Sequence, residues 1–157
     1  MNPTISLQEL HDFIVRAKAA TYVGDGKKAD SCRPGSHDLK FQEGRFSYLD
    51  SYFGGSDFIG QEVVYFHDEP VWAMNYYGKI IEPEKISAAE TGGVIRESLS
   101  QMYREGRFLG GFEHETGNGI YTDTSQGNLE SFTGTEWITQ DGIKVYELVY
   151  HGGLIKP

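Results

Sequence analysis

Residues 37–52 repeat with a period of two, which is the period of a β-strand and not of a helix. Short turns interrupt the alternation, and Glu43-Gly44 is the clearest of them. The pattern predicts four strands joined as an antiparallel meander, at 37–42, 46–52, 61–66 and 71–77. Large side chains occupy both faces of the last two strands, so we expect both faces of this sheet to be at least partly covered.

Helices are predicted before and after this meander. A capping-box pattern starts at Ser6, and apolar residues then recur every three or four positions, so the first helix is expected from about Ser6 to near Ala20. The second helix is expected at 91–104, where Gly106 ends it, after a turn or a separate helical piece at 84–90.

The rest of the chain is predicted to hold two loops and three more strands. The polar segment 24–36 is expected to be an exposed, mobile loop, and the glycine-rich segment 106–119 a connection. The further strands are expected at 119–124, 129–139 and 143–151. Together these elements predict an α+β fold, a twisted antiparallel sheet of about six or seven strands with two main helices packed against it, in a single domain spanning 1–157. An all-β barrel with peripheral helices is the alternative.

An internal similarity appears at an offset of 98 residues. Segment 42–55 superimposes without a gap on segment 140–153, with six identities in fourteen positions. Each copy is a turn, a strand with two tyrosines on one face, and a glycine pair. The similarity indicates either a duplication or two hairpins that reached one geometry independently. The order of the predicted elements contradicts a simple tandem repeat.

The charge of the chain excludes several classes of partner. It carries 23 Asp and Glu against 14 Lys and Arg, a net charge of −9, so it repels phosphate groups and anionic lipid. We therefore expect no nucleic-acid binding by this chain alone and no membrane contact. Its apolar runs are far shorter than the ~20 residues of a spanning helix, and no signal peptide is recognisable. Cys32, the only cysteine, cannot form an intramolecular disulfide. A cytoplasmic protein, monomeric or homodimeric, is the expectation.

Motifs that would identify an enzyme or a metalloprotein are missing from the sequence. The five histidines never occur at metal-ligand spacing, and one cysteine cannot build a thiolate zinc site, so no metal and no cofactor is expected. Cys32 adjoins Arg33 and lies five residues before His37, and such cations activate a thiol. Because no third group or oxyanion site is recognisable, we assign no catalytic residue and do not favour an enzyme.

Polar residues at two strand positions have aromatic neighbours on the same face. Asp50 is in phase with Tyr48 and Tyr52, and Asn75 is in phase with Tyr77. Burying a carboxylate or an amide costs several kcal/mol unless it finds partners. Either this face lines a wet cavity, or these residues belong to a structural network or an exposed surface.

The cavity interpretation defines the candidate site. Aromatic walls with a few polar anchors are typical of small-molecule binding, so we predict a sensor or effector-type domain that binds an unidentified small ligand. One alternative is a hydrolase in which Asp50 or Glu62 is the general acid or base. Another is a protein-interaction module with an exposed aromatic patch that includes Tyr76 and Tyr77. The candidate ligand-binding residues are Arg33, His37, Tyr48, Asp50, Tyr52, Glu62, Trp72, Asn75, Tyr76 and His151.

Five blocks of the sequence resemble an uncharacterised bacterial domain family of unknown function. The blocks are 33–39, 48–55, 58–62, 70–78 and 150–154. Some members of that family carry a helix-turn-helix module ahead of the domain, so the resemblance implies an effector or partner domain of a regulator. Only a few residues precede the first predicted helix here, which indicates a stand-alone version. The resemblance transfers no catalytic residue, but all the candidate site residues lie within its blocks.

Overall fold

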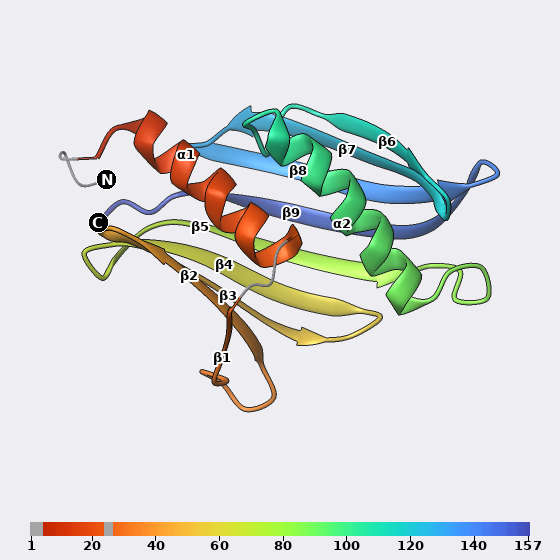
Figure 1. Cartoon of the computed structure of the whole chain (residues 1–157), viewed down its shortest axis with the longest axis horizontal. Coiled ribbons are helices and arrows are strands. Elements are labelled where there is room, and N and C mark those ends of the chain that lie inside the picture. Colours follow the sequence, from red (N-terminus) through yellow and green to blue (C-terminus); the bar gives the residue numbers. More distant parts are fainter. Residues whose placement is uncertain (1–4, 24–26) are drawn as a thin grey trace.

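One antiparallel sheet of nine strands carries both helices on a single face in the computed structural model, which describes residues 5–23 and 27–157 (Figure 1). The N-terminal part contains α1 (Leu7–Lys18), the π-helical turn η1 (Ala19–Val23), β1 (Lys27–Ala29), β2 (His37–Glu43), β3 (Phe46–Gly54), β4 (Phe58–Phe66) and β5 (Glu69–Ile80). The C-terminal part contains α2 (Ala88–Arg104), β6 (Phe112–Thr116), β7 (Gly119–Asn128), β8 (Ser131–Gln140) and β9 (Ile143–Leu154). The α+β class and the meander of β2 to β5 are as the sequence predicted.

The order of β2 to β9 across the sheet is palindromic, because the two meanders are arranged symmetrically about its centre, with β1 outside this symmetry. The full order is β1-β2-β3-β4-β5-β9-β8-β7-β6, and all neighbours are antiparallel. β5 and β9 lie side by side in the middle, where Tyr76 is opposite Tyr150. An approximate twofold rotation through this pair therefore exchanges the two meanders. Each meander follows its own helix in the sequence, so each half is one helix and four strands, with β1 as an additional edge strand.

Equivalent places in the two halves hold the same residue types. The strands correspond at an offset of 73 or 74 residues, and the helices at an offset of 81, which equates Ser6 with Ser87 and Tyr22 with Tyr103. The identical strand pairs are Tyr48 and Tyr121, Asp50 and Asp123, Gly54 and Gly127, Phe58 and Phe132, Gly60 and Gly134, Glu62 and Glu136, Val71 and Val145, Tyr76 and Tyr150, and Gly78 and Gly152.

The similarity at an offset of 98 residues is not this duplication. It aligns β3 with β9, but the palindromic order makes β7 the counterpart of β3 and makes β5 the counterpart of β9. The two glycine pairs also lie apart, because Gly152 is opposite Met74 in the sheet and Gly153 is opposite Ala73. The two segments are similar because both are a turn followed by a tyrosine-bearing strand.

Both helices begin at a serine N-cap. Ser6 accepts a hydrogen bond from the backbone N–H of Glu9 at 3.0 Å, and Ser87 forms a complete capping box with Glu90. The second helix therefore starts at Ala88 rather than at residue 91, and 88–90 belong to it. This cap stabilises the first turn ahead of Gly92-Gly93, which made the sequence look weak there.

The helices cover one face of the sheet and leave the other open. On the covered face β5 buries Trp72, Met74 and Tyr76, whose neighbours in the core include Phe13 and Ile14 of α1. On the open face Tyr77 is 47% exposed and Val149 is 57% exposed. The expected partial cover of this second face is found beside β2 and β3, where Asp38 and Ser51 are 3% and 4% exposed and bond to Ser36 and Arg33, but no described helix packs there.

The sheet has nine strands, not six or seven. The two unpredicted strands are β1, within the expected loop 24–36, and β6, within the expected connection 106–119. Both are short edge strands of three and five residues, too short for a period-two pattern to stand out. The rest of the expected loop includes residues 24–26, which lie outside the described residues. No described helix is long and apolar enough to cross a membrane.

Candidate functional site

Four buried acids lie on the covered face, two in each half. Asp50 is opposite Glu62 in the β3–β4 register, and Asp123 is opposite Glu136 in the β7–β8 register. The exposed fractions are 1% for Asp50 and Glu62, 4% for Asp123 and 6% for Glu136. Carboxyl groups this deeply buried need hydrogen-bond or ionic partners.

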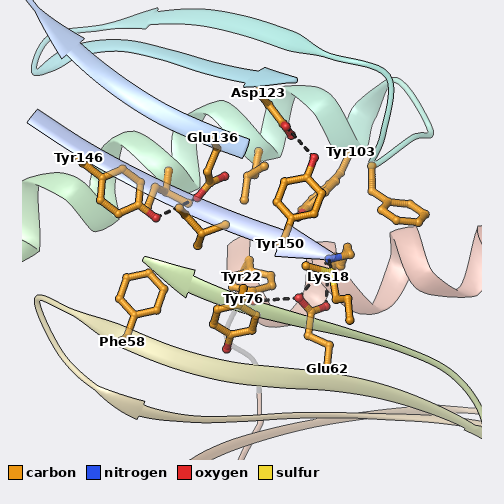
Figure 2. Close-up of a pocket in the computed structure, with 15 residues that line it drawn as sticks. Lys18, Tyr22, Phe58, Glu62, Tyr76, Tyr103, Asp123, Glu136, Tyr146 and Tyr150 are labelled. Carbon is orange, nitrogen blue, oxygen red and sulfur yellow. Dashed lines mark hydrogen bonds and ion pairs between the residues drawn. The ribbon is translucent and has the colours of Figure 1, made fainter. Parts of the chain in front are cut away.

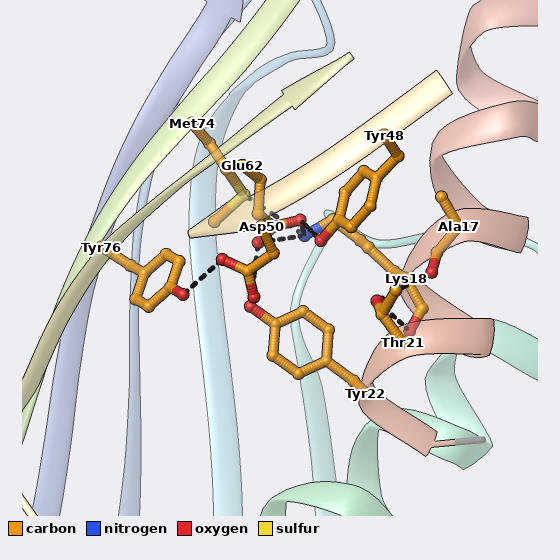
Figure 3. Close-up of polar contacts among 9 residues, drawn as sticks. All are labelled: Ala17, Lys18, Thr21, Tyr22, Tyr48, Asp50, Glu62, Met74 and Tyr76. Atoms are coloured by element: carbon orange, nitrogen blue, oxygen red, sulfur yellow. Dashed lines mark hydrogen bonds and ion pairs between the residues drawn. The ribbon is translucent and has the colours of Figure 1, made fainter. Parts of the chain in front are cut away.

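In the N-terminal half the partners of the acids include a buried lysine (Figure 3). Lys18 Nζ, at the end of α1, lies 3.0 Å and 3.1 Å from the two carboxylate oxygens of Glu62. The Tyr48 hydroxyl donates to Glu62 Oε1 at 2.5 Å, and the Tyr22 hydroxyl donates to Glu62 Oε2 at 3.1 Å. Asp50 Oδ1 accepts from the Tyr76 hydroxyl at 2.6 Å. This half thus contains an ion pair set among tyrosines.

In the C-terminal half the partners are tyrosines alone (Figure 2). The Tyr150 hydroxyl donates to Asp123 Oδ1 at 2.7 Å, which repeats the bond from Tyr76 to Asp50. Glu136 accepts from the Tyr146 hydroxyl at 2.9 Å and from the Tyr121 hydroxyl. Leu99 occupies the position on α2 that corresponds to Lys18 on α1, so no cation from the helix reaches Glu136.

Two glycines make room for the tyrosines that contact the aspartates. A Cβ on Gly60 would lie 2.4 Å from the Tyr76 hydroxyl oxygen, and a Cβ on Gly134 would lie 2.2 Å from that of Tyr150. Any other residue there would displace the tyrosine. The repeated Phe-x-Gly-x-Glu segment therefore has a packing reason, because its glycine admits the ring from the neighbouring strand.

These groups surround a cavity of about 100 Å³ between the sheet and the helices. Glu62, Asp123 and Glu136 line it, and Lys18 is the one cation among its described lining residues. A wider pocket of about 310 Å³ adjoins it, contains Asp50 and Tyr52, and includes the exposed Arg96. The two spaces share a wall made of Tyr22, Phe58, Tyr76 and Ile95. The wider pocket is thus an antechamber to the acidic cavity.

Burial raises the pKa of both aspartates, which keeps them partly protonated near neutral pH. Burial and the neighbouring charge of Glu62 raise the pKa of Asp50 to about 7. Burial and the charge of Glu136 raise the pKa of Asp123 to about 7 in the same way. The pKa of Glu136 is also raised by burial, and its two tyrosine donors oppose that rise. The cavity therefore holds carboxyl groups that a cation would cause to ionise.

Four of the predicted site residues come together on the covered face, namely Tyr48, Asp50, Glu62 and Tyr76. Tyr52 lines the antechamber, and His37 lies beside it with ring centroids 5.1 Å apart, at an exposed position. Trp72 is fully buried behind the cavity, where its indole N–H donates to the Leu129 carbonyl at 3.2 Å.

The other predicted residues lie away from the cavity. Asn75 and His151 face each other on the open side of the sheet, 3.5 Å apart and exposed. Arg33 is also on that side, where its guanidinium lies 4.7 Å from the Phe53 ring centroid and donates to Ser51 Oγ at 2.9 Å. These three residues do not join one constellation with Asp50. Tyr76 is buried, so it cannot form an exposed patch with its neighbour in sequence.

Sequence reasoning missed the C-terminal half of the site and the helix residues that face it. A usable signal existed, because Tyr-x-Asp occurs at 48–50 and 121–123, and Phe-x-Gly-x-Glu occurs at 58–62 and 132–136. Lys18 gave no such signal, since a lysine at the end of a helix is ordinarily solvated. The missed residues are Lys18, Tyr22, Tyr103, Tyr121, Asp123, Glu136, Tyr146 and Tyr150.

The model of a family described as a domain of unknown function, DUF5680, matches residues 50–155. The matched segment contains all four buried acids, but it begins after α1 and therefore does not include Lys18. No curated protein and no solved structure matches the chain. Within the described residues, no group of three or more His, Cys, Asp or Glu side chains is arranged to hold a metal ion.

Proposed function

The chain belongs to the DUF5680 family, which brings no activity with it, and we propose from the site alone that the protein binds a small organic cation between the sheet and the helices. One observation carries the proposal: four buried carboxyls are concentrated around or beside a tyrosine-lined cavity whose described lining supplies one cation. Within the described lining of this cavity, Lys18 is the one cation that faces Glu62, Asp123 and Glu136, so the acids outnumber the cation three to one.

The chemistry of the walls fits a cationic ligand. Carboxylates attract an ammonium group, and the faces of aromatic rings add cation–π attraction in a site that excludes water. Tyr103, Tyr146 and Tyr150 supply such rings beside Glu136 and Asp123. A neutral ligand would leave the acids as they are, so the protein gains most from a cation.

A sensor is the form of binding that we propose. The antechamber includes exposed residues and shares a wall with the acidic cavity, and a ligand seated in the cavity would contact α1, α2 and the sheet together. Binding would therefore favour one arrangement of the two helices. A partner that contacts the helices could then distinguish the occupied from the empty protein.

The experiment is a thermal-shift screen followed by calorimetry at about pH 8, with linear and aromatic amines as probes and alcohols of the same shape as neutral controls. We expect amines, and not alcohols, to raise the melting temperature, because a ligand that binds only the folded state stabilises it by mass action. Asp123→Asn should weaken that effect. Glu113→Gln, which removes an equal charge at an exposed position of β6, should leave it unchanged.

The pH dependence gives a second test. Because the pKa of Asp123 is about 7, the fraction that is ionised falls about tenfold between about pH 8 and pH 6. Amine binding should weaken by a similar factor over that range. Stabilisation by alcohols as strong as that by amines, or amine binding that tightens towards acid pH, would contradict the proposal. Turnover of a glycoside or ester, abolished by Glu62→Gln, would favour the hydrolase alternative instead.

A further inference from the structure

The N-terminal half of the site already holds an alkylammonium group, the side chain of Lys18. Its Nζ contacts both carboxylate oxygens of Glu62 and lies 3.2 Å from Met74 Sδ. The same atom lies 5.5 to 6.0 Å from the centroids of three aromatic rings, those of Phe108, Tyr22 and Trp72. Oxygen acceptors on one side and ring faces on the others are what a bound primary ammonium requires.

The twofold relation places the same surroundings in the C-terminal half without the lysine. Glu136 stands for Glu62, Tyr103 for Tyr22, Tyr146 for Trp72 and Leu148 for Met74, and all four line the cavity. The helix position that carries the amine in one half carries Leu99 in the other, and this leucine also lines the cavity.

Glu62 and Glu136 differ in the number of hydrogen bonds that they accept, and a ligand on Glu136 would supply the missing ones. Glu62 accepts four hydrogen bonds, two from Lys18 and one each from Tyr22 and Tyr48. Glu136 accepts two among the described residues, from Tyr121 and Tyr146. A carboxylate has sites for about four donors, so Glu136 has acceptor capacity to spare.

Tyr103 gives an independent sign of a missing partner. Its side chain lines the cavity and is 8% exposed, and its hydroxyl makes no hydrogen bond within the part of the chain that the structure describes. The equivalent hydroxyl, that of Tyr22, donates to the glutamate of its own half at 3.1 Å. This hydroxyl therefore has a donor free for a ligand in the cavity, whose lining also includes Glu136.

We infer that a primary alkylammonium ligand binds in the C-terminal half of the cavity, with its nitrogen on Glu136 in the place that mirrors Lys18 Nζ. This inference rests on the proposed function and names its ligand class. A primary amine fits because it keeps N–H donors for the carboxylate, as Lys18 does, whereas a quaternary ammonium has none. The four-carbon stem of lysine sets the scale, and a cavity of about 100 Å³ suits a ligand of that size.

The test introduces an amine into the C-terminal half by substitution of Leu99. In Leu99→Lys the new side chain starts from the position equivalent to that of Lys18 and should occupy the ligand site. Calorimetry with n-butylamine is the readout, with Ala89→Lys as the matched control, N,N,N-trimethylbutylammonium as the quaternary probe and butan-1-ol as the neutral one. Leu99→Lys should lose n-butylamine binding by about tenfold to a hundredfold, since charge-assisted hydrogen bonds are worth roughly 1.5–3 kcal/mol. Ala89→Lys adds the same charge to α2 at an exposed position away from the cavity and should bind as the wild type does.

Each outcome separates this inference from the proposed function. If amines bind but Leu99→Lys binds n-butylamine like the wild type, or if the quaternary probe binds as well as the primary amine, this inference is overturned and the proposed function stands. If no cation binds to the wild type, both fail. If Leu99→Lys does not fold, Glu136→Gln replaces it: the inference requires a loss of n-butylamine binding of at least about tenfold, and unchanged binding overturns it.

Discussion

The two halves of the sheet are built alike, and they differ in how their acids are neutralised. In the N-terminal half Lys18 forms an ion pair with Glu62, and in the C-terminal half Leu99 leaves Glu136 with tyrosines only. One helix position thus separates a half that satisfies its own charge from a half that remains open. The duplicated framework holds the acids in both halves, while the residue at the helix position of Lys18 and Leu99 decides whether a ligand site is available.

Loss of the buried amine should have the largest effect of any change in this comparison. Lys18→Met leaves Glu62 buried without its cation, and breaking a buried ion pair from one side costs about 3–5 kcal/mol in the free energy of unfolding. Leu99→Met at the equivalent position should cost less than about 1.5 kcal/mol. Urea denaturation of both variants measures the difference. Equal losses would mean that the two positions do not differ in the way proposed.

The two aspartates should behave as a matched pair in their pH dependence. The pKa of each is raised to about 7, so between about pH 4 and pH 7 the folded state keeps protons that the unfolded state has released. Stability therefore falls as pH rises through that window and levels off above it. Asp50→Asn and Asp123→Asn should each be more stable than the wild type at about pH 8, by a few kcal/mol, and lose that advantage towards pH 4.

Urea denaturation at several pH values checks this, and the exposed Glu113→Gln serves as the control. Equal effects of the two asparagine variants would confirm that the halves are equivalent at the aspartates. If only one of the two variants reduced the pH dependence of the free energy of unfolding, the two halves would not be equivalent at the aspartates.

The two glycines that admit the tyrosines provide a smaller and symmetrical test. Gly60→Ala and Gly134→Ala each place a methyl group where the tyrosine from the neighbouring strand now lies. Each should destabilise the protein by about 1–3 kcal/mol, because an overpacked core must shift a ring. Gly55→Ala has open space around its Cβ and is the control. A large cost for one glycine and none for the other would show that only one half depends on this packing.

The smallest effect should follow removal of the tyrosine hydroxyls that contact the aspartates. Tyr76→Phe and Tyr150→Phe each delete one hydrogen bond, for a loss of about 1 kcal/mol. Each hydroxyl also lowers the pKa of its aspartate, so that pKa should rise in the variant. Side-chain carboxyl titration by NMR gives the direction. A fall in either pKa would contradict the assigned hydrogen bond.

Alternation along the strands predicted part of the site. It singled out Asp50 because a carboxylate stood in phase with Tyr48 and Tyr52, and that residue is indeed buried among tyrosines. It failed for Asn75, since β5 carries large side chains on both faces and the sequence does not say which face the helices cover. The residues in phase with Asn75 turned out to face the open side.

The rest of the site depends on long-range placement. Lys18 reaches Glu62 across 44 residues of sequence, and the two sheet halves are joined by the β5–β9 pair, whose strands are far apart in the sequence. Neither relation follows from local pattern, because the order of strands in a sheet is not the order in the chain. The fold class came from local periods, whereas the edge strands β1 and β6 were too short to show one.

The position of β9 bears on how the protein is made. Of the strands that the structure describes, it is synthesised after all the others, yet it lies in the middle of the sheet, between β5 and β8. Until β9 is synthesised, β5 and β8 are unpaired on one side and can pair with other chains. The first meander gains its neighbour only when this strand, far along the sequence, has been made. A chain that ends early, without these twelve residues, would lose the centre of its sheet and not its rim. Chaperones should therefore engage the growing chain late in synthesis, after β8 and before β9 closes the seam.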